Sequence, residues 1–154
     1  MQKDYIMRAV EHFVQLLVSI IAKRKAGKYE EALEQIQTAS RFYLKTDLSL
    51  LIYCSPDQLL NHFRRYSGEL DVEQCVLCAD LLNELALLRE AQNNSEEALR
   101  IKVLCLYLYV TAIPQDKQFQ DSPRLAKVAS LIEELKGISL PESVQLSLLR
   151  FKNS

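Results

Sequence analysis

The sequence has little glycine, little proline, no tryptophan and no excess of charge of either sign. It contains three glycines and four prolines in 154 residues, and apolar and polar residues do not alternate over any sustained stretch as they do in half-buried strands. Lys and Arg number 19 against 20 Asp and Glu, so the overall field that draws basic proteins to nucleic acid or anionic lipid is missing. We therefore expect an all-α protein that binds neither nucleic acid nor membrane.

Motifs of catalysis are also scarce. The sequence has no glycine-rich phosphate loop, and no serine lies in the context of a nucleophile elbow. The two histidines, His12 and His62, each adjoin a phenylalanine and have no evident sequence partner that would complete a nucleophile or general-base arrangement. The sequence predicts no catalytic residue, no cofactor and no enzymatic activity.

Long hydrophobic runs are absent as well. The apolar stretches 13–22 and 103–113 are shorter than the ~20 residues that a membrane-spanning helix needs, so both are predicted to be buried helices. A basic cluster, Lys23, Arg24 and Lys25, follows the first stretch in place of a small-residue cleavage site. Because no export signal is present, we predict a cytoplasmic location.

Four cysteines raise the question of a metal site. Cys75 and Cys78 have the spacing of half a zinc site, which Cys54 and His62 could complete. However, the outer spacings are irregular, and the Cys75 pair lies within an apolar segment. The preferred interpretation is that these residues and Cys105 are reduced thiols that pack as small hydrophobes. A metal-binding or small-molecule regulatory domain is the alternative hypothesis.

The most informative stretch is 27–33, Gly-Lys-Tyr-Glu-Glu-Ala-Leu, which is typical of the tight turn in a tetratricopeptide-like helical hairpin. The predicted helices on either side of it cover 4–26 and 29–44, and the first has an apolar arc wide enough to be sandwiched. A weaker copy, Asn-Asn-Ser-Glu-Glu-Ala-Leu at 93–99, follows 66 positions later, close to two 34-residue periods.

Small residues just after each turn support the hairpins, because the two helices of such a unit cross closely. Ala32, Ile36 and Ala39 match the small, large, small pattern in the first copy. The second copy has Ala98 and Cys105 but places Lys102 at the position where an apolar residue is expected. The sequence therefore predicts one domain over 1–154, a short stack of antiparallel helical hairpins, with an irregular antiparallel helix bundle as the alternative.

The remaining segments carry start and stop signals of helices. A short helix is predicted over 47–53, and another begins at Ser55, buries Tyr66 and ends at Gly68. A long helix covers 71–91, and Asn94 caps the next. The polar connection 115–121, whose apolar residue is Phe119, is predicted to be a mobile loop. The next helix starts at 122 and ends near Gly137. Residues 139–142, beginning with Ser139, are predicted to cap a last helix that closes the stack.

Three motifs resemble those of a family of small uncharacterised cytoplasmic proteins from Gram-positive Firmicutes bacteria. They are Asp-Tyr-Ile-Met-Arg at 4–8, the turn at 27–33, and Gly-Glu-Leu-Asp-Val-Glu at 68–73. The resemblance extends to about Ala112. It implies a bacterial tetratricopeptide-like fold and carries over no catalytic residue.

If the hairpins stack, the first helix of each pair forms the wall of a groove. On the tetratricopeptide pattern that wall consists of Val14, Leu17, Ile21, Arg24, Lys25, Asp80, Asn83, Leu87 and Glu90. An apolar wall with charged ends favours a non-enzymatic module that binds a protein segment or forms a homodimer. The alternative is that the C-terminal helices cover Val14, Leu17 and Ile21, which would leave no open groove.

Overall fold

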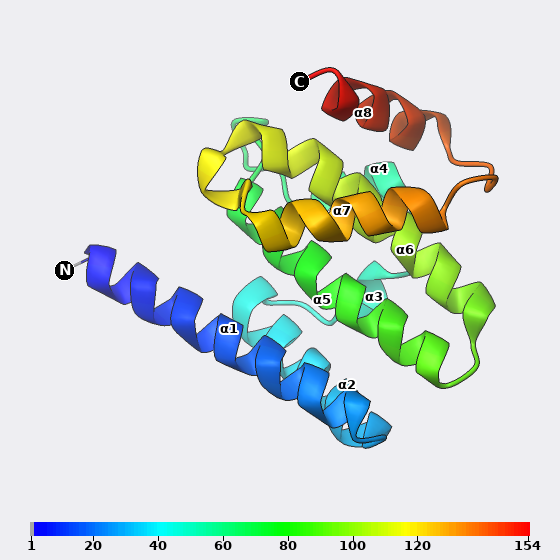
Figure 1. Cartoon of the computed structure of the whole chain (residues 1–154). Helices are drawn as coiled ribbons and strands as arrows, with labels where there is room; N and C mark the ends of the chain where they lie inside the picture. Colours follow the sequence, from blue (N-terminus) through cyan, green and yellow to red (C-terminus); the bar gives the residue numbers. More distant parts are fainter. Residues whose placement is uncertain (1) are drawn as a thin grey trace.

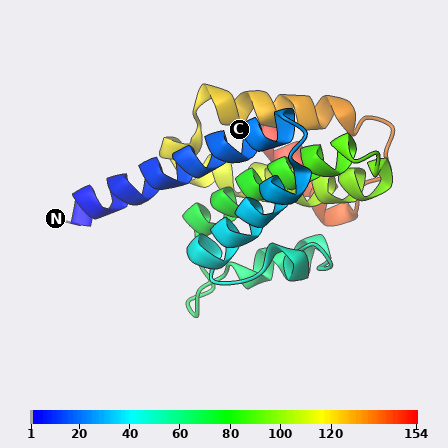
Figure 2. The same ribbon diagram turned by 90° about the horizontal axis from the view of Figure 1, so that it is seen from below.

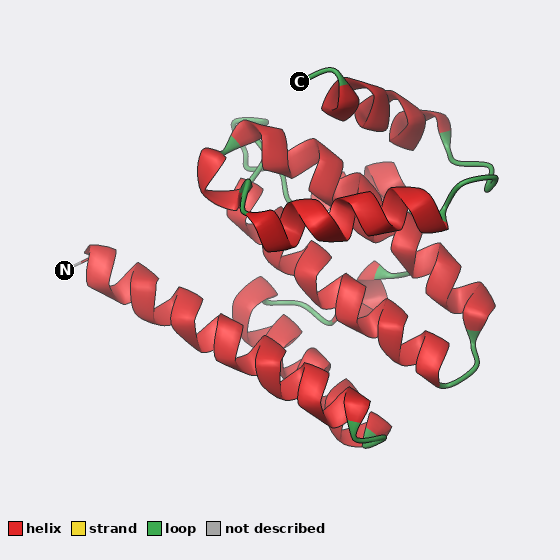
Figure 3. Ribbon diagram, viewed as in Figure 1, coloured by secondary structure: helices red, strands yellow, loops and turns green. Residues whose placement is uncertain are grey.

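The computed structural model describes residues 2–154, with side chains described from Arg8 onward. Within that part of the chain the regular elements are helices, and the strand-like feature is an isolated antiparallel bridge between Arg64 and Leu70. Figure 3 shows these helices joined by short connections. The predicted all-α fold is confirmed.

The first hairpin pairs α1 (Gln2–Lys25) with α2 (Tyr29–Ala39). Gly27 has a φ of 77°, a left-handed conformation that costs glycine little. The N–H of Lys28 donates to the carbonyl of Lys23 at 2.9 Å, which closes the last turn of α1 and sends the chain back antiparallel (Figure 1). Ala32 and Ala39 are fully buried, as predicted for a close crossing.

The second hairpin, α5 (Val72–Ala91) and α6 (Ser95–Ala112), lies at the centre of the molecule. Its turn repeats the bond pattern of the first, because the N–H of Asn94 donates to the carbonyl of Arg89 at 2.8 Å and Asn93 has a φ of 63°. Asparagine therefore occupies the place of Gly27. Asn94 caps α6 by accepting from the N–H of Glu97, as predicted.

The segment between the hairpins departs from the prediction in two places. The helix expected over 29–44 changes to a π-helix, η1 (Ser40–Leu44), followed by α3 (Leu48–Leu51) and α4 (Pro56–His62). The predicted capping box of Ser55 is present, but the helix stops at His62 and not at Gly68, and Tyr66 is fully exposed. The prediction of a buried Tyr66 was wrong because the chain doubles back, with the N–H of Asp71 donating to the carbonyl of Phe63.

The C-terminal region contains two 3₁₀ turns, η2 (Ile113–Gln115) and η3 (Lys117–Phe119), then α7 (Ser122–Glu134) and α8 (Glu142–Lys152). The polar connection predicted to be a mobile loop is thus organised around a buried Phe119, whose ring lies 5.4 Å from the guanidinium of Arg124. The predicted cap at Ser139 was also wrong, because Pro141 precedes α8 and supplies no side-chain hydrogen bond.

The arrangement of the helices places α1 and α7 on one side of the central pair. α1 and α2 pack on α5, α7 and α8 pack on α6, and α4 lies against both α6 and α8. Figures 1 and 2 show α1 and α7 flanking α5 on the same side of the molecule. The expectation that α1 is sandwiched was wrong, since Val10, Val14 and Val18 are half exposed or more. Among the helices of the described residues, none has the length and apolar character required to cross a bilayer.

Candidate functional site

The candidate site is the side of α5 that lies between α1 and α7. Asp80, Asn83, Glu84 and Leu87 follow one another at helical spacing on this side. Three of these residues are polar, yet the side chain of Asp80 is 1% exposed and that of Glu84 is 3% exposed. Charged groups this deeply buried require partners, and α1, α6 and α7 supply them.

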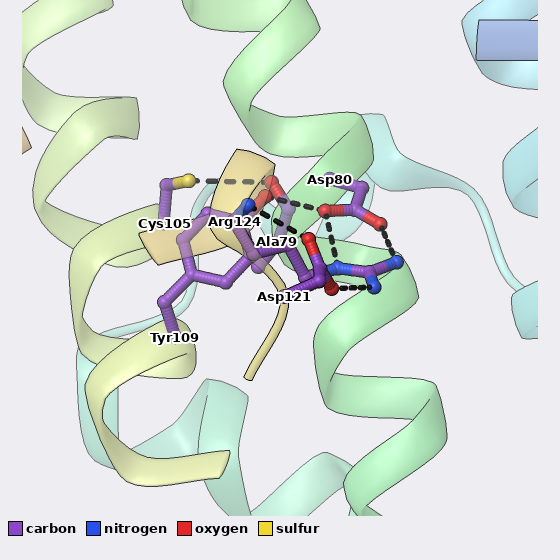
Figure 4. A network of polar contacts seen from close by, with 6 residues as sticks. All are labelled: Ala79, Asp80, Cys105, Tyr109, Asp121 and Arg124. Atoms are coloured by element: carbon purple, nitrogen blue, oxygen red, sulfur yellow. Dashed lines mark hydrogen bonds and ion pairs between the residues drawn. The ribbon is translucent and has the colours of Figure 1, made fainter. Parts of the chain in front are cut away.

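Asp80 joins three helices through its carboxylate (Figure 4). Arg124 Nη2 of α7 donates to Asp80 Oδ2 at 2.8 Å, and the hydroxyl of Tyr109 on α6 donates to Asp80 Oδ1 at 2.5 Å. Asp121, the N-cap of α7, accepts from Arg124 Nη1 at 2.8 Å. Nearby, the thiol of Cys105 donates to the carbonyl of Ala79 at 3.2 Å. The network satisfies the buried carboxylate and fixes the position of α7 on α5.

The pKa values of the network follow from burial and from this pairing. Burial, reinforced by the Asp80 charge, raises the pKa of Tyr109 well above its ordinary value. Burial opposes the charge of Arg124, but its hydrogen bonds and charge interactions with Asp80 and Asp121 together outweigh that effect and raise the pKa of the guanidinium. Arg124 and Asp80 therefore form an ion pair, and Tyr109 remains a neutral donor to it.

Glu84 lies one turn further along α5 and faces α1. Arg24 Nη2 approaches Glu84 Oε1 at 3.5 Å, but neither Arg24 Nε nor Glu84 Oε1 has a hydrogen-bond partner among the described residues. Burial raises the pKa of Glu84, although the charges of Arg24 and Lys127 lower it in part. This carboxylate is therefore held by charge more than by hydrogen bonds, unlike Asp80.

A small pocket of about 270 Å³ opens beside Glu84, between α5, α6 and α7. Its lining comprises Asn83, Glu84, Leu87, Lys102, Lys127, Ser130, Leu131 and Glu134. Lys102, the residue that breaks the expected apolar pattern of α6, is 4% exposed and forms ion pairs with both Glu90 and Glu134. Burial opposes the charge of Lys102, but these two partners raise its pKa. Lys102 thus ties the ends of α5 and α7 together.

The α1 side of the site is apolar and open. Val14 is 49% exposed, Leu17 and Ile21 are half-buried, and Lys25 is exposed. The sequence left open the alternative that the C-terminal helices cover this face. At Val14 they do not. A surface with apolar residues on α1, paired charges on α5 and a polar edge on α7 can hold a peptide or helix by shape and hydrophobic contact.

The predicted wall residues thus fall into two groups. Val14, Leu17, Ile21, Lys25 and Leu87 are accessible in full or in part. Three of the others form ion pairs within the chain: Arg24 with Glu84, Asp80 with Arg124, and Glu90, which is itself exposed, with Lys102. Asn83 lies at the edge of the pocket with 9% exposure.

Sequence reasoning missed Glu84, Arg124 and Lys127. One signal could have revealed the first, because Asp80 and Glu84 stand four residues apart within an otherwise apolar helix and so require cationic neighbours. Nothing in the sequence indicates that Arg124 and Lys127 supply them, since α7 is far away in the chain.

The cysteine and histidine residues considered for zinc have different environments. Cys75 and Cys78 are buried, Cys54 is half-buried, and His62 is exposed. Burial raises the pKa of Cys75 to about 12, which disfavours the thiolate that binds metal. Among the residues that the structure describes, no three His, Cys, Asp or Glu side chains gather as a metal site requires.

Comparison with family models, curated proteins and solved structures gave no match to this chain. The resemblance to the Firmicutes family and to tetratricopeptide proteins stays a prediction from the sequence motifs.

Proposed function

We propose that this chain is a non-enzymatic helical-repeat interaction module, tetratricopeptide-like and cytoplasmic in a bacterium, which binds a protein segment or its own copy. The binding face consists of the exposed side of α1, the accessible part of α5 around Leu87, and the edge of α7 that carries Lys127. The proposal depends on one observation, an apolar row on α1 of which Val10 and Val14 are about half exposed.

Leaving that row in water costs free energy. Val10 and Val14 are each about half exposed, and Leu17 and Ile21 continue the row toward α5. Each valine or leucine side chain that a partner buries contributes roughly 25 cal/mol per Å² of apolar surface removed from water. Exposed apolar residues that form a row on one helix, beside a polar rim, are typical of protein-binding surfaces.

The paired charges of α5 support this role by making the face rigid. Asp80 fixes α7 and Glu84 contacts α1, so the two sides of the face are held to the same helix. A face of fixed shape loses less conformational entropy on binding than a flexible one.

Partner capture from a bacterial lysate tests the proposal when matched variants are compared. Ile21→Glu introduces a charge on the groove side of α1, and Leu149→Glu introduces the same charge on the outward side of α8, where Leu149 is 58% exposed. We expect the wild type and Leu149→Glu to retain the same protein, and Ile21→Glu to lose it. Capture of nothing specific, or equal capture by both variants, would contradict the proposal.

A further inference from the structure

The outward face of α1 carries an acidic residue, two valines and a basic residue in a line. Successive residues of an α-helix turn by about 100°, so Glu11, Val14, Val18 and Lys25 lie within about 60° of arc. This arc is centred nearly opposite the fully buried Ile20. All four side chains are exposed, and Val18 is 61% exposed.

This face lies on the side of α1 that is turned away from the helices on which α1 packs, α2 and α5. Both ribbon views show the N-terminal part of α1 extending beyond the other helices (Figures 1 and 2). A second helix that covers Val14 and Val18 would remove their exposed apolar surface from water.

The charges on the face are complementary to those of a second copy. Glu11 precedes Val18 by seven residues and Lys25 follows it by seven. If two α1 helices pair antiparallel about Val18, Glu11 of each copy lies opposite Lys25 of the other, so the same contact forms twice. Within the described side chains, neither Glu11 nor Lys25 has an ion-pair partner in its own chain.

The basic end of α1 selects the direction of the pair. Lys23, Arg24 and Lys25 occupy the last turn. A parallel pair would bring two such clusters together, whereas an antiparallel pair separates them and sets the helix dipoles in opposite directions. Charge therefore argues for a second copy in one orientation.

We propose that two copies of this chain associate through the Glu11, Val14, Val18 and Lys25 face of α1, antiparallel and with two-fold symmetry about Val18. The inference rests on the proposed function, of which it is the self-binding branch. It shares Val14 with the binding face described above and leaves Ile21 and Leu87 accessible to a different partner.

Sedimentation or light scattering at several concentrations tests the association. The wild type is expected to have twice the chain mass of 17.7 kDa, and Val18→Glu to weaken dimerisation about ten-fold or more, since it places two like charges at the two-fold axis. Leu149→Glu is the control and should leave the dimer unchanged. Circular dichroism should show equal helix content in all three proteins.

A charge exchange tests the orientation. Glu11→Lys and Lys25→Glu should each weaken the dimer several-fold, and the double variant should restore it, because the pairs re-form with opposite polarity. Failure of the double variant to recover would overturn the antiparallel register, and a wild type that stays monomeric at high concentration would overturn the association itself. A monomer whose partner capture still depends on Ile21 would refute the self-binding inference alone and leave the proposed function standing.

Discussion

Asp80 shows how a single buried carboxylate can organise this fold. Its two oxygens accept from Arg124 and Tyr109, so one side chain of α5 connects α7 and α6. A buried charge of this kind costs free energy to desolvate, and its partners recover that cost only while the whole set is intact. Asp80 is therefore expected to be sensitive to substitution.

Replacing Asp80 by Asn should destabilise the protein by about 3 kcal/mol, because Arg124 is left partly buried without its counter-charge. Urea unfolding measures the change. The control is Glu133→Gln, whose exposed pair with Lys136 contributes little and should change the free energy of unfolding by less than about 0.5 kcal/mol. Equal effects of the two substitutions would contradict the role assigned to Asp80.

Glu84 should make stability depend on pH in the opposite sense from most carboxylates. Its pKa is raised by burial above the ordinary value of 4.5, so the folded state binds the proton more tightly than the unfolded state. The free energy of unfolding should then fall as the pH rises from 4.5 through the raised pKa, and Glu84 should contribute no further change above it. Glu84→Gln removes this contribution.

Urea unfolding of the wild type and of Glu84→Gln between about pH 4 and pH 7 isolates that contribution as the difference between the two curves. Other titrating groups cancel in the difference. Two parallel curves would show that Glu84 is not protonated more readily in the folded state.

At the scale of elements, the two hairpin turns are the part of the structure that local sequence determines. Gly27 and Asn93 both adopt a left-handed conformation, and the same backbone bonds follow each. Turns and helix caps depend on a few adjacent residues, so the sequence predicts them well. The caps at Ser55, Asp71 and Asn94 are examples.

The elements that were not predicted depend on contacts between distant segments. Lys102 of α6 lies between Glu90 of α5 and Glu134 of α7, and Asp80 of α5 pairs with Arg124 of α7. The apolar row of α1 was predictable from its period, but its exposure was not, since that depends on which helices reach α1. The candidate site was thus predicted on its α1 side and missed on its α7 side.

The two helices of each hairpin cross closely, and a small buried residue, Ala98 in the second hairpin, lies just after the turn. Ala98→Leu should destabilise the protein by about 1–3 kcal/mol, because Ala98 is 1% exposed and a larger side chain overfills the space. Ala129→Leu, at an exposed position of α7, is the control and should be nearly neutral. Thermal and urea unfolding measure both, and a neutral Ala98→Leu would show that the helices do not need a small residue there.

At the scale of the whole molecule, α8 protects the central hairpin. It packs on α6 and α4, and its own Val144 is fully buried against the rest of the molecule. The outward residues of α8 include Leu146 and Leu149, so this helix buries one side and exposes the other. Terminal helices with this role keep the last apolar surface of a helical stack away from water.

A chain that ends at Ile138 should therefore lose about 2 kcal/mol or more, since burying one valine side chain such as Val144 contributes about 1.5–3 kcal/mol. It should also bind the hydrophobic dye ANS. A chain that ends at Lys152 keeps α8 and serves as the control. Unfolding and dye fluorescence report the outcome, and identical behaviour of the two truncated chains would contradict a protective role.

The central position of α6 has a consequence for synthesis on the ribosome. When residues up to Asn94 have emerged, α5 is complete, but Leu81, Leu82 and Leu85 have no α6 to cover them. The nascent chain therefore presents its most apolar helix to water until α6 has followed. During that interval it is a candidate for chaperone binding and aggregation, and a slow translation step near position 94 would lengthen the exposure.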